Sequence, residues 1–151
     1  MAPRNLRTFK ALTSDILEEV CFLLPARVGL EEEPAAQTIT VHIACGNTTD
    51  LYLEFDARLA KVITGNFLGK SDEETSIDST MVTSSIMEIG NMVGGNYMNA
   101  LDMPPDTHLS PPEIVESPWS DARERVHYSI ATDTIFAEGY PIHLMLVEHL
   151  L

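Results

Sequence analysis

The chain has 151 residues, of which 44% are hydrophobic, so it is long enough for one domain with a substantial core and too short for two. Its 9 Lys and Arg residues stand against 23 Asp and Glu residues, which gives a formal net charge of −14. This balance argues against nucleic acids and anionic membranes as partners, because both are bound through clustered basic residues. From the length and hydrophobic content we expect a single globular domain over residues 1–151.

The N-terminal segment predicts a helix followed by a loop. Thr13, Ser14 or Asp15 can cap this helix, which should end before Pro25. Residues 31–34, three glutamates followed by a proline, are then predicted to form a solvated loop.

A hairpin is predicted next. Residues 37–45 alternate between apolar and polar side chains, which is typical of a half-buried strand. Gly46 and Asn47 supply a turn, and residues 51–55 alternate in the same way. Two antiparallel strands are therefore expected here.

Two helices follow the hairpin. Residues 57–68 have helical spacing and stop at Gly69. A longer helix is predicted over 79–101, capped by Asp78 or by its own first residue, and ended by the prolines that begin at Pro104.

The C-terminal part predicts an irregular edge segment and two more strands. Residues 108–118 carry three prolines, whereas residues 125–131 and 140–148 have strand patterns separated by a bend at 139–141. Mixed helices and antiparallel hairpins predict an α+β fold in two layers, with the long helix and a second helix packed on a mainly antiparallel sheet.

Sequence features also bear on the cellular compartment. Cys21 and Cys45 fit no metal-ligand spacing, and their apolar surroundings predict buried thiols in a reducing compartment. The N-terminus lacks the apolar segment of a signal peptide, and no stretch is long enough to span a bilayer. We therefore expect a cytoplasmic protein.

The long predicted helix has an unusual outer face. Its expected buried stripe consists of Val82, Ile86, Ile89, Val93, Tyr97 and Ala100. The opposite face carries Ser84, Glu88, Asn91 and Gly95. Methionines flank that line at Met81, Met87, Met92 and Met98. Gly90, Gly94 and Gly95 interrupt the helix, and each costs about 0.8–1 kcal/mol relative to Ala, so close packing or close approach is expected there.

Glu88 and Asn91 are the candidate functional pair. A carboxamide can hold a water molecule by donating and accepting hydrogen bonds, which is a task that phosphoryl transfer requires. A Glu one turn away can pair with a cation on the molecule that carries the phosphoryl group. Flexible methionines suit an adaptable protein-binding surface. From the residues alone, a solvated helix face remains the alternative interpretation.

No other catalytic pattern is present. The sequence has no Gly-x-Ser-x-Gly, no P-loop, and no His spacing typical of a metal site. Glu88 and Asn91 supply neither a metal ion nor a nucleophile, so they would form half of a site that a partner completes.

The pattern Ser84-x3-Glu88-x2-Asn91, continued by Met92-Val93-Gly94-Gly95-Asn96, resembles the signature of the CheX/CheC/FliY chemotaxis phosphatases. In that family, Asp or Ser is followed by x3-Glu-x2-Asn and then by a Gly-containing segment. The predicted order of elements agrees with the family over most of the chain, so the resemblance implies a CheC-like fold.

The resemblance also implies roles and partners. The substrate would be a phosphorylated CheY-like response regulator, with Asn91 orienting the attacking water and Glu88 pairing with the regulator's lysine. The chain would need no cofactor of its own, because the Mg²⁺ would belong to the receiver domain. Partner contacts would come from Ser84, Met81, Met87, Met92, Gly95 and Met98, with Gly94 and Gly95 serving close packing.

The resemblance further implies a CheX-like homodimer formed through the sheets, with one site per chain. A weak echo, Ser14-x3-Glu18-x2-Cys21, has a Cys where the motif has its amide. Two other functions stay open: a non-catalytic module that binds a receiver domain, and an adaptor that binds another protein through the methionines.

Overall fold

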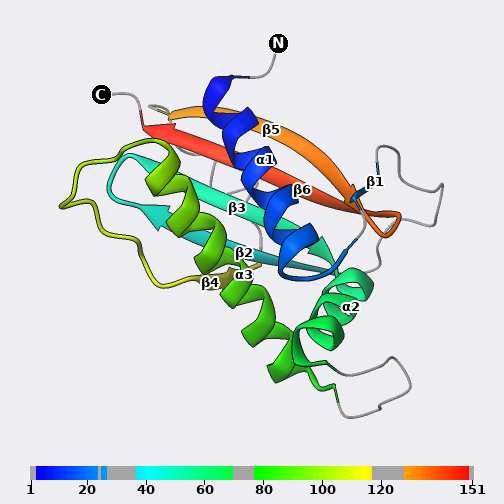
Figure 1. The fold of residues 1–151 in the computed structure, drawn as a ribbon. Coiled ribbons are helices and arrows are strands. Elements are labelled where there is room, and N and C mark those ends of the chain that lie inside the picture. Colours follow the sequence, from blue (N-terminus) through cyan, green and yellow to red (C-terminus); the bar gives the residue numbers. More distant parts are fainter. Residues whose placement is uncertain (1–2, 24, 27–36, 70–76, 117–127, 150–151) are drawn as a thin grey trace.

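The computed structural model describes residues 3–23, 25–26, 37–69, 77–116 and 128–149. Within these residues, three helices cover one face of a six-stranded antiparallel sheet with the order β1-β5-β6-β3-β2-β4 (Figure 1). The helices are α1 (Arg4–Glu19), α2 (Ala57–Leu68) and α3 (Ser79–Ala100). The strands are β1 (Pro25–Ala26), β2 (Thr38–Cys45), β3 (Thr49–Asp56), β4 (Glu113–Val115), β5 (Tyr128–Ala137) and β6 (Tyr140–His149). The predicted two-layer α+β fold is confirmed, and α1 is a third helix in the helical layer.

The predicted start of the first helix is wrong. Thr13, one of the expected caps, is buried inside α1, and its hydroxyl donates a hydrogen bond to the carbonyl of Phe9 at 2.8 Å. The buried stripe of α1 already begins at Leu6, and the ring of Phe9 packs edge-on against Tyr97 of α3, with centroids 6.1 Å apart. Tertiary packing therefore extends the helix toward the N-terminus, and the helix ends at Glu19, earlier than expected.

The hairpin and the second helix agree with the sequence. β2 and β3 pair along their whole lengths, and Gly46 takes a left-handed φ of 64° in the turn. α2 has the predicted bounds because local signals set both ends. The carboxylate of Asp56 accepts a hydrogen bond from the backbone N–H of Arg58 at 2.8 Å, and Gly69 has a φ of 67°.

The long helix is confirmed as well. The carboxylate of Asp78 caps α3 by accepting a hydrogen bond from the backbone N–H of Met81 at 2.9 Å. None of the helices in the described residues is both long and apolar enough to cross a membrane.

The C-terminal strands differ in length from the prediction. The proline-rich segment contributes the three-residue strand β4 at the edge of the sheet, paired with β2. β5 runs on to Ala137, and the turn to β6 falls at Glu138 and Gly139, which both have positive φ. β1 is too short to leave a sequence pattern. The loop predicted at 31–34, residues 117–118 of the edge segment and residues 125–127 of the predicted strand lie outside the described residues.

The core lies between the helices and the inner face of the sheet. Its centre is formed by side chains with no exposed surface, among them Val41, Ile43, Leu51, Leu53, Phe55, Ile142, Leu144 and Leu146. Both cysteines are free and buried, as predicted, and burial raises the pKa of Cys21 and of Cys45 to about 12.

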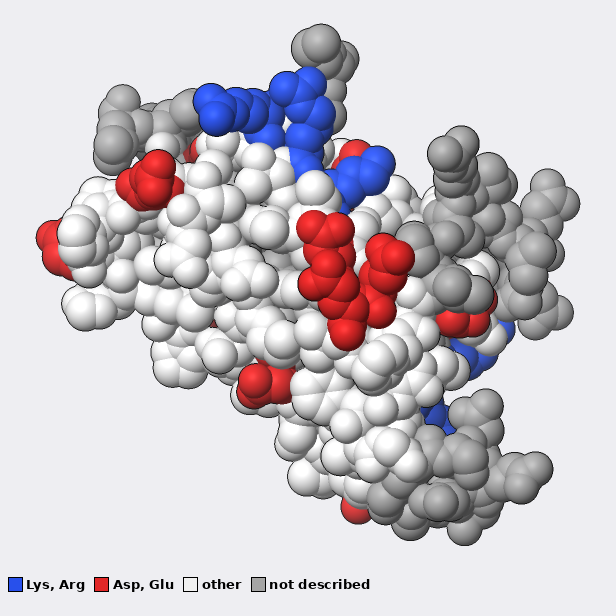
Figure 2. Space-filling model, viewed as in Figure 1, with Lys and Arg blue, Asp and Glu red and all other residues white. Residues whose placement is uncertain are grey.

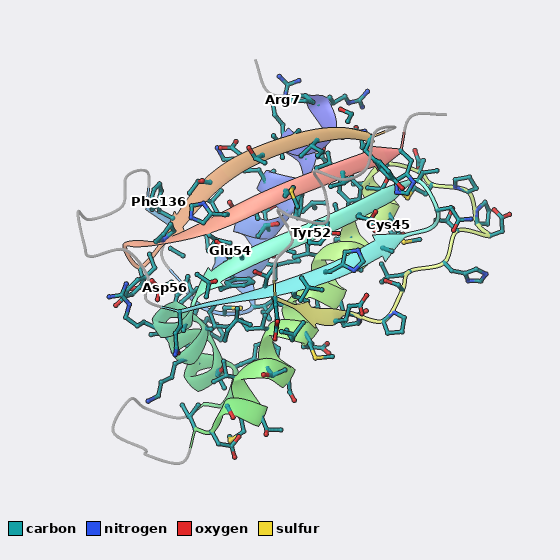
Figure 3. The ribbon with its side chains drawn as sticks, turned by 180° about the vertical axis from the view of Figure 1, so that it is seen from behind. Arg7, Cys45, Tyr52, Glu54, Asp56 and Phe136 are labelled. Atoms are coloured by element: carbon teal, nitrogen blue, oxygen red, sulfur yellow. The ribbon has the colours of Figure 1, made fainter. Side chains whose placement is uncertain are left out.

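Figure 3 shows the outer face of the sheet, on the side opposite the helices. A polar network on this face joins four neighbouring strands. The carboxylate of Asp50 on β3, which is only 7% exposed, lies 2.7 Å from Nε2 of His42 on β2 and 3.0 Å from Nε2 of His149 on β6. Nδ1 of His42 lies 3.2 Å from the carboxylate of Glu113 on β4. The network therefore connects β6, β3, β2 and β4.

Burial and the network act in opposite directions on its pKa values. Burial lowers the pKa of His42, but the hydrogen bonds and charges of Asp50 and Glu113 raise it by more than burial lowers it. The pKa of His42 therefore lies above its ordinary value of 6.5. Burial raises the pKa of Asp50, but the bonds and charges of His42 and His149 outweigh it, so this pKa lies below 3.8.

These shifts predict a pH-dependent stability. Because its pKa is raised on folding, His42 contributes its full stabilisation below pH 6.5, and this contribution is lost as the pH rises through the folded-state pKa. The lowered Asp50 pKa contributes above its unfolded value and is lost as the pH falls. The network therefore favours folding most between about pH 4 and 6.5.

Urea denaturation at pH 5.5, 6.5 and 8 tests this. The His42→Gln variant should lose about 1–2 kcal/mol of unfolding free energy at pH 5.5 and less at pH 8, because a charge-assisted hydrogen bond is removed. The exposed His108 provides a control as His108→Gln, which should follow wild type at every pH. Parallel pH profiles for wild type and His42→Gln would contradict the coupling.

Candidate active site

Glu88 and Asn91 lie on the face of α3 that points away from the sheet, and both are exposed. Asn91 is the third residue after Glu88, which places the two about 4.5 Å apart along the helix axis and about 60° apart around it. Ser84 is exposed on the same line, and Gly95 is half-buried on it. The structure thus brings together the residues of the predicted motif on one surface.

The opposite face of α3 is fixed in the core. Ile86, Ile89, Val93 and Tyr97 have no exposed surface. Val82 and Ala100, which were predicted on the same stripe, are half-buried and exposed because they lie toward the two ends of the helix. The motif therefore stands on a rigid support.

Two glycines allow α3 to approach β2 closely. A Cβ at Gly90 would lie 3.0 Å from a methyl carbon of Val41 and 3.0 Å from Cδ1 of Ile43. A Cβ at Gly94 would lie 2.8 Å from Cδ1 of Leu109. Close packing is confirmed as the reason for these two glycines. At Gly95 the same interpretation is wrong, since a Cβ there would meet no described atom within 4 Å.

Glu88 is the single charged residue in the sequence of α3. Figure 2 shows a mainly uncharged surface over this helix, whereas basic and acidic side chains gather on α1, where Arg4, Arg7 and Lys10 precede Asp15, Glu18 and Glu19. Among the described residues, neither Glu88 nor Asn91 has a hydrogen-bond or ion-pair partner for its side chain. Both groups are therefore available to an external partner.

The methionines beside the motif divide into two pairs. All four are half-buried, but Met92 and Met98 pack partly against the hydrophobic core. Met81 lines a shallow depression of about 270 Å³ together with Ser84 and Leu68. Leu68 is 45% exposed and was not identified from the sequence, although an apolar last residue before the helix-ending Gly69 was a usable signal.

Other parts of the molecule offer less to catalysis. A larger hollow of about 570 Å³ lies between the turn at Gly46 and the segment after α3, and none of the predicted site residues lines it. The echo of the motif ends in Cys21, which is buried beyond the end of α1. Within the described ranges, no cluster of three or more His, Cys, Asp or Glu side chains could hold a metal ion.

The chain matches a known family. The family model described as chemotaxis phosphatase CheX matches residues 38–130, which include β2, β3, α2, α3, β4 and the start of β5. A search of curated protein sequences finds no match.

Solved structures share the fold. A CheX–CheY–BeF3–Mg²⁺ complex from Borrelia burgdorferi contains a chain with a TM-score of 0.67 and 15% identity, which covers 97% of this chain and 98% of that one. The chemotaxis protein CheX from Vibrio vulnificus has a TM-score of 0.66 and 20% identity, covering 95% and 98%. FliY from Thermotoga maritima has a TM-score of 0.58 and 15% identity, covering 99% and 91%.

At these identities the structural likeness concerns the fold, and the family is shown by the match over more than half of the 151 residues. That match includes the whole of α3 with its exposed Glu88 and Asn91. The chain belongs to the CheX family of chemotaxis phosphatases.

Proposed function

We propose that this protein hydrolyses the phosphoaspartate of a CheY-like receiver domain. The observation that carries the proposal is that Glu88 and Asn91 are exposed on an otherwise uncharged helix, and that their side chains have no partner among the residues the structure describes. The CheX–CheY complex of Borrelia burgdorferi supports the choice of partner.

Asn91 positions the water in this mechanism. Its carboxamide oxygen accepts a hydrogen bond from a water molecule while its amide N–H₂ group donates to the phosphoryl oxygens or to the water. The water oxygen forms a bond to phosphorus as the bond to the aspartyl oxygen breaks, which yields inorganic phosphate and a free carboxylate. The chain itself contributes no nucleophile to this step.

Glu88 orients the helix on the receiver. Its carboxylate accepts a charge-assisted hydrogen bond from the lysine ammonium of the receiver's active site, and this pair fixes the depth and rotation of α3. Ser84 and the methionines at 81, 87, 92 and 98 surround the pair as adaptable contacts. No cofactor belongs to this chain, and the receiver's Mg²⁺ neutralises charge on the phosphoryl group.

A non-catalytic receiver-binding module is the second candidate, and an adaptor that binds another protein through its methionines is the third. The intact Glu88 and Asn91 favour phosphatase activity over both. A cytoplasmic location belongs to the same proposal, because the phosphorylated receiver must reach α3.

Replacing Asn91 by Ala should reduce the accelerated decay of a phosphorylated CheY-like receiver by on the order of a hundredfold, because the water loses its positioning group. The decay of labelled phosphoryl receiver is measured with each variant in excess. Asn96→Ala is the matched control, since Asn96 is an exposed amide on the same helix but about 140° around from Asn91, and it should keep full activity.

If Asn91→Ala accelerates decay as wild type does, the water-positioning role is lost. If wild type binds the receiver but leaves its own decay rate unchanged, the protein is a binding module.

For Glu88→Gln, we expect the KM for the phosphorylated receiver to rise roughly tenfold or more, with a smaller change in kcat, because a charge-assisted bond becomes a neutral one. The increase in KM should shrink as NaCl is added, since salt screens the wild-type ion pair. Glu18→Gln, which removes an exposed charge from α1, serves as the control. A KM that equals the wild-type value at low salt would refute the anchoring role.

We also propose a homodimer in which β5 pairs across a two-fold axis. β5 pairs with β6 along its whole length, but it pairs with β1 only at Phe136 and Ala137. Residues 129–135 thus present a strand edge that no described strand covers, and Ile130 within this edge is 43% exposed. Such edges favour pairing with another strand.

Sedimentation velocity at micromolar concentration should give twice the chain mass of 16.7 kDa for wild type. Ile130→Lys should shift the protein toward the monomer, because like charges would meet across the axis. A wild-type monomer under these conditions is the result that rejects the dimer.

A further inference from the structure

Gly95 is the one glycine of α3 that internal packing does not require. Gly90 and Gly94 are explained by β2 and Leu109, because a Cβ at either glycine would lie within 3.0 Å of their side chains and would require them to shift. At Gly95 a Cβ would have no described atom within 4 Å. Gly95 is also absent from the positions with positive φ, so the backbone conformation suits any L-residue.

An open helical glycine is unfavourable for the isolated protein. Ala at such a position would strengthen the helix, because Gly loses more backbone freedom on folding. Gly95 is also not at a helix end, where a glycine cap would be useful, since α3 continues to Ala100. A reason for glycine must therefore be sought outside the described chain.

The position of Gly95 points to the partner. It follows Asn91 by four residues, which places it about 6 Å farther along the axis and about 40° around it. It is therefore on the exposed line that carries Ser84, Glu88 and Asn91, one turn beyond the water-positioning amide. A partner that receives the Asn91 side chain therefore also comes near the backbone at Gly95.

We propose that Gly95 is a docking contact at which the main chain of the receiver, beside its phosphorylation site, lies directly against the bare backbone of α3. This inference rests on the proposed phosphatase function and adds a steric requirement to it. A methyl group at this position would hold the two backbones farther apart. Such a displacement moves Asn91 out of its productive position, where an error of about 1 Å can reduce the rate up to a hundredfold.

The test uses the full chain carrying Gly95→Ala. We expect its Tm to rise by about 2–4 °C, as the helix gains an alanine, while kcat/KM for the phosphorylated receiver falls tenfold or more. The same variant should bind a beryllofluoride-activated receiver more weakly in a titration. A gain in stability together with a loss of activity is not expected from a position that serves only the fold.

One control variant tests the effect of a more stable helix, and a second tests the effect of disturbed packing. Asn96→Ala also places an alanine on the exposed surface of α3, so it should raise Tm slightly and leave kcat/KM unchanged. Gly90→Ala should lower Tm, because both methyl carbons of Val41 and Cδ1 of Ile43 lie within 3.2 Å of the new Cβ.

The outcomes separate the two proposals. If wild type accelerates decay and Gly95→Ala does so equally well, the docking contact is overturned and the phosphatase function stands. If wild type accelerates nothing, the phosphatase function fails, and the binding titration alone decides the contact: equal affinity overturns it, and weaker affinity supports it. A lower Tm for Gly95→Ala would mean that the fold itself requires glycine at this position, and this result would also overturn the docking contact.

Discussion

The close approach of α3 to β2 is the constraint on which the site depends. Gly90 and Gly94 remove the side chains that would separate the helix from Val41 and Ile43. The helix can then bury one full face against the sheet, and its cap at Asp78 sets where it begins. Because that face is fixed, the direction in which Glu88 and Asn91 point is fixed too. Preorganisation of this kind is what a water-positioning side chain needs.

The proposed chemistry follows from the groups that the site lacks. A carboxylate and a carboxamide without a nucleophile cannot hydrolyse a phosphoryl group by themselves, but they can complete a centre that the partner holds. The mainly uncharged surface around Glu88 fits this division of roles, because one isolated charge can select the position of one cation. The outer face of the sheet lies on the side of the molecule opposite α3 (Figure 3), and there the Asp50 network contributes stability.

Local signals were sufficient where the structure is locally determined. Asp56 and Gly69 set both ends of α2, and Asp78 sets the start of α3, so these bounds could be predicted. The start of α1 could not be predicted, because Thr13 has the side chain of a typical helix cap. The helix instead begins earlier, where Phe9 can pack against Tyr97 of another helix. The Asp50 network was equally hidden, since β6 brings His149 to Asp50 from 99 residues away.

At the site, too, local sequence signals were sufficient for some features and tertiary contacts determined others. The spacing of Glu88 and Asn91 made the pair a candidate, and its resemblance to a family motif supplied the proposed function. The separate reasons for Gly94 and Gly95 could not be predicted, because they depend on the rotation of α3 over β2, which is set by the whole core.

A structure of the protein bound to a beryllofluoride-activated, Mg²⁺-loaded CheY-like receiver would test the central claim most directly. The predicted result is the side chain of Asn91 within hydrogen-bonding distance of a water in line with the beryllofluoride, and Glu88 paired with the receiver's lysine. A complex in which the receiver binds elsewhere and the exposed line of α3 faces solvent would contradict it.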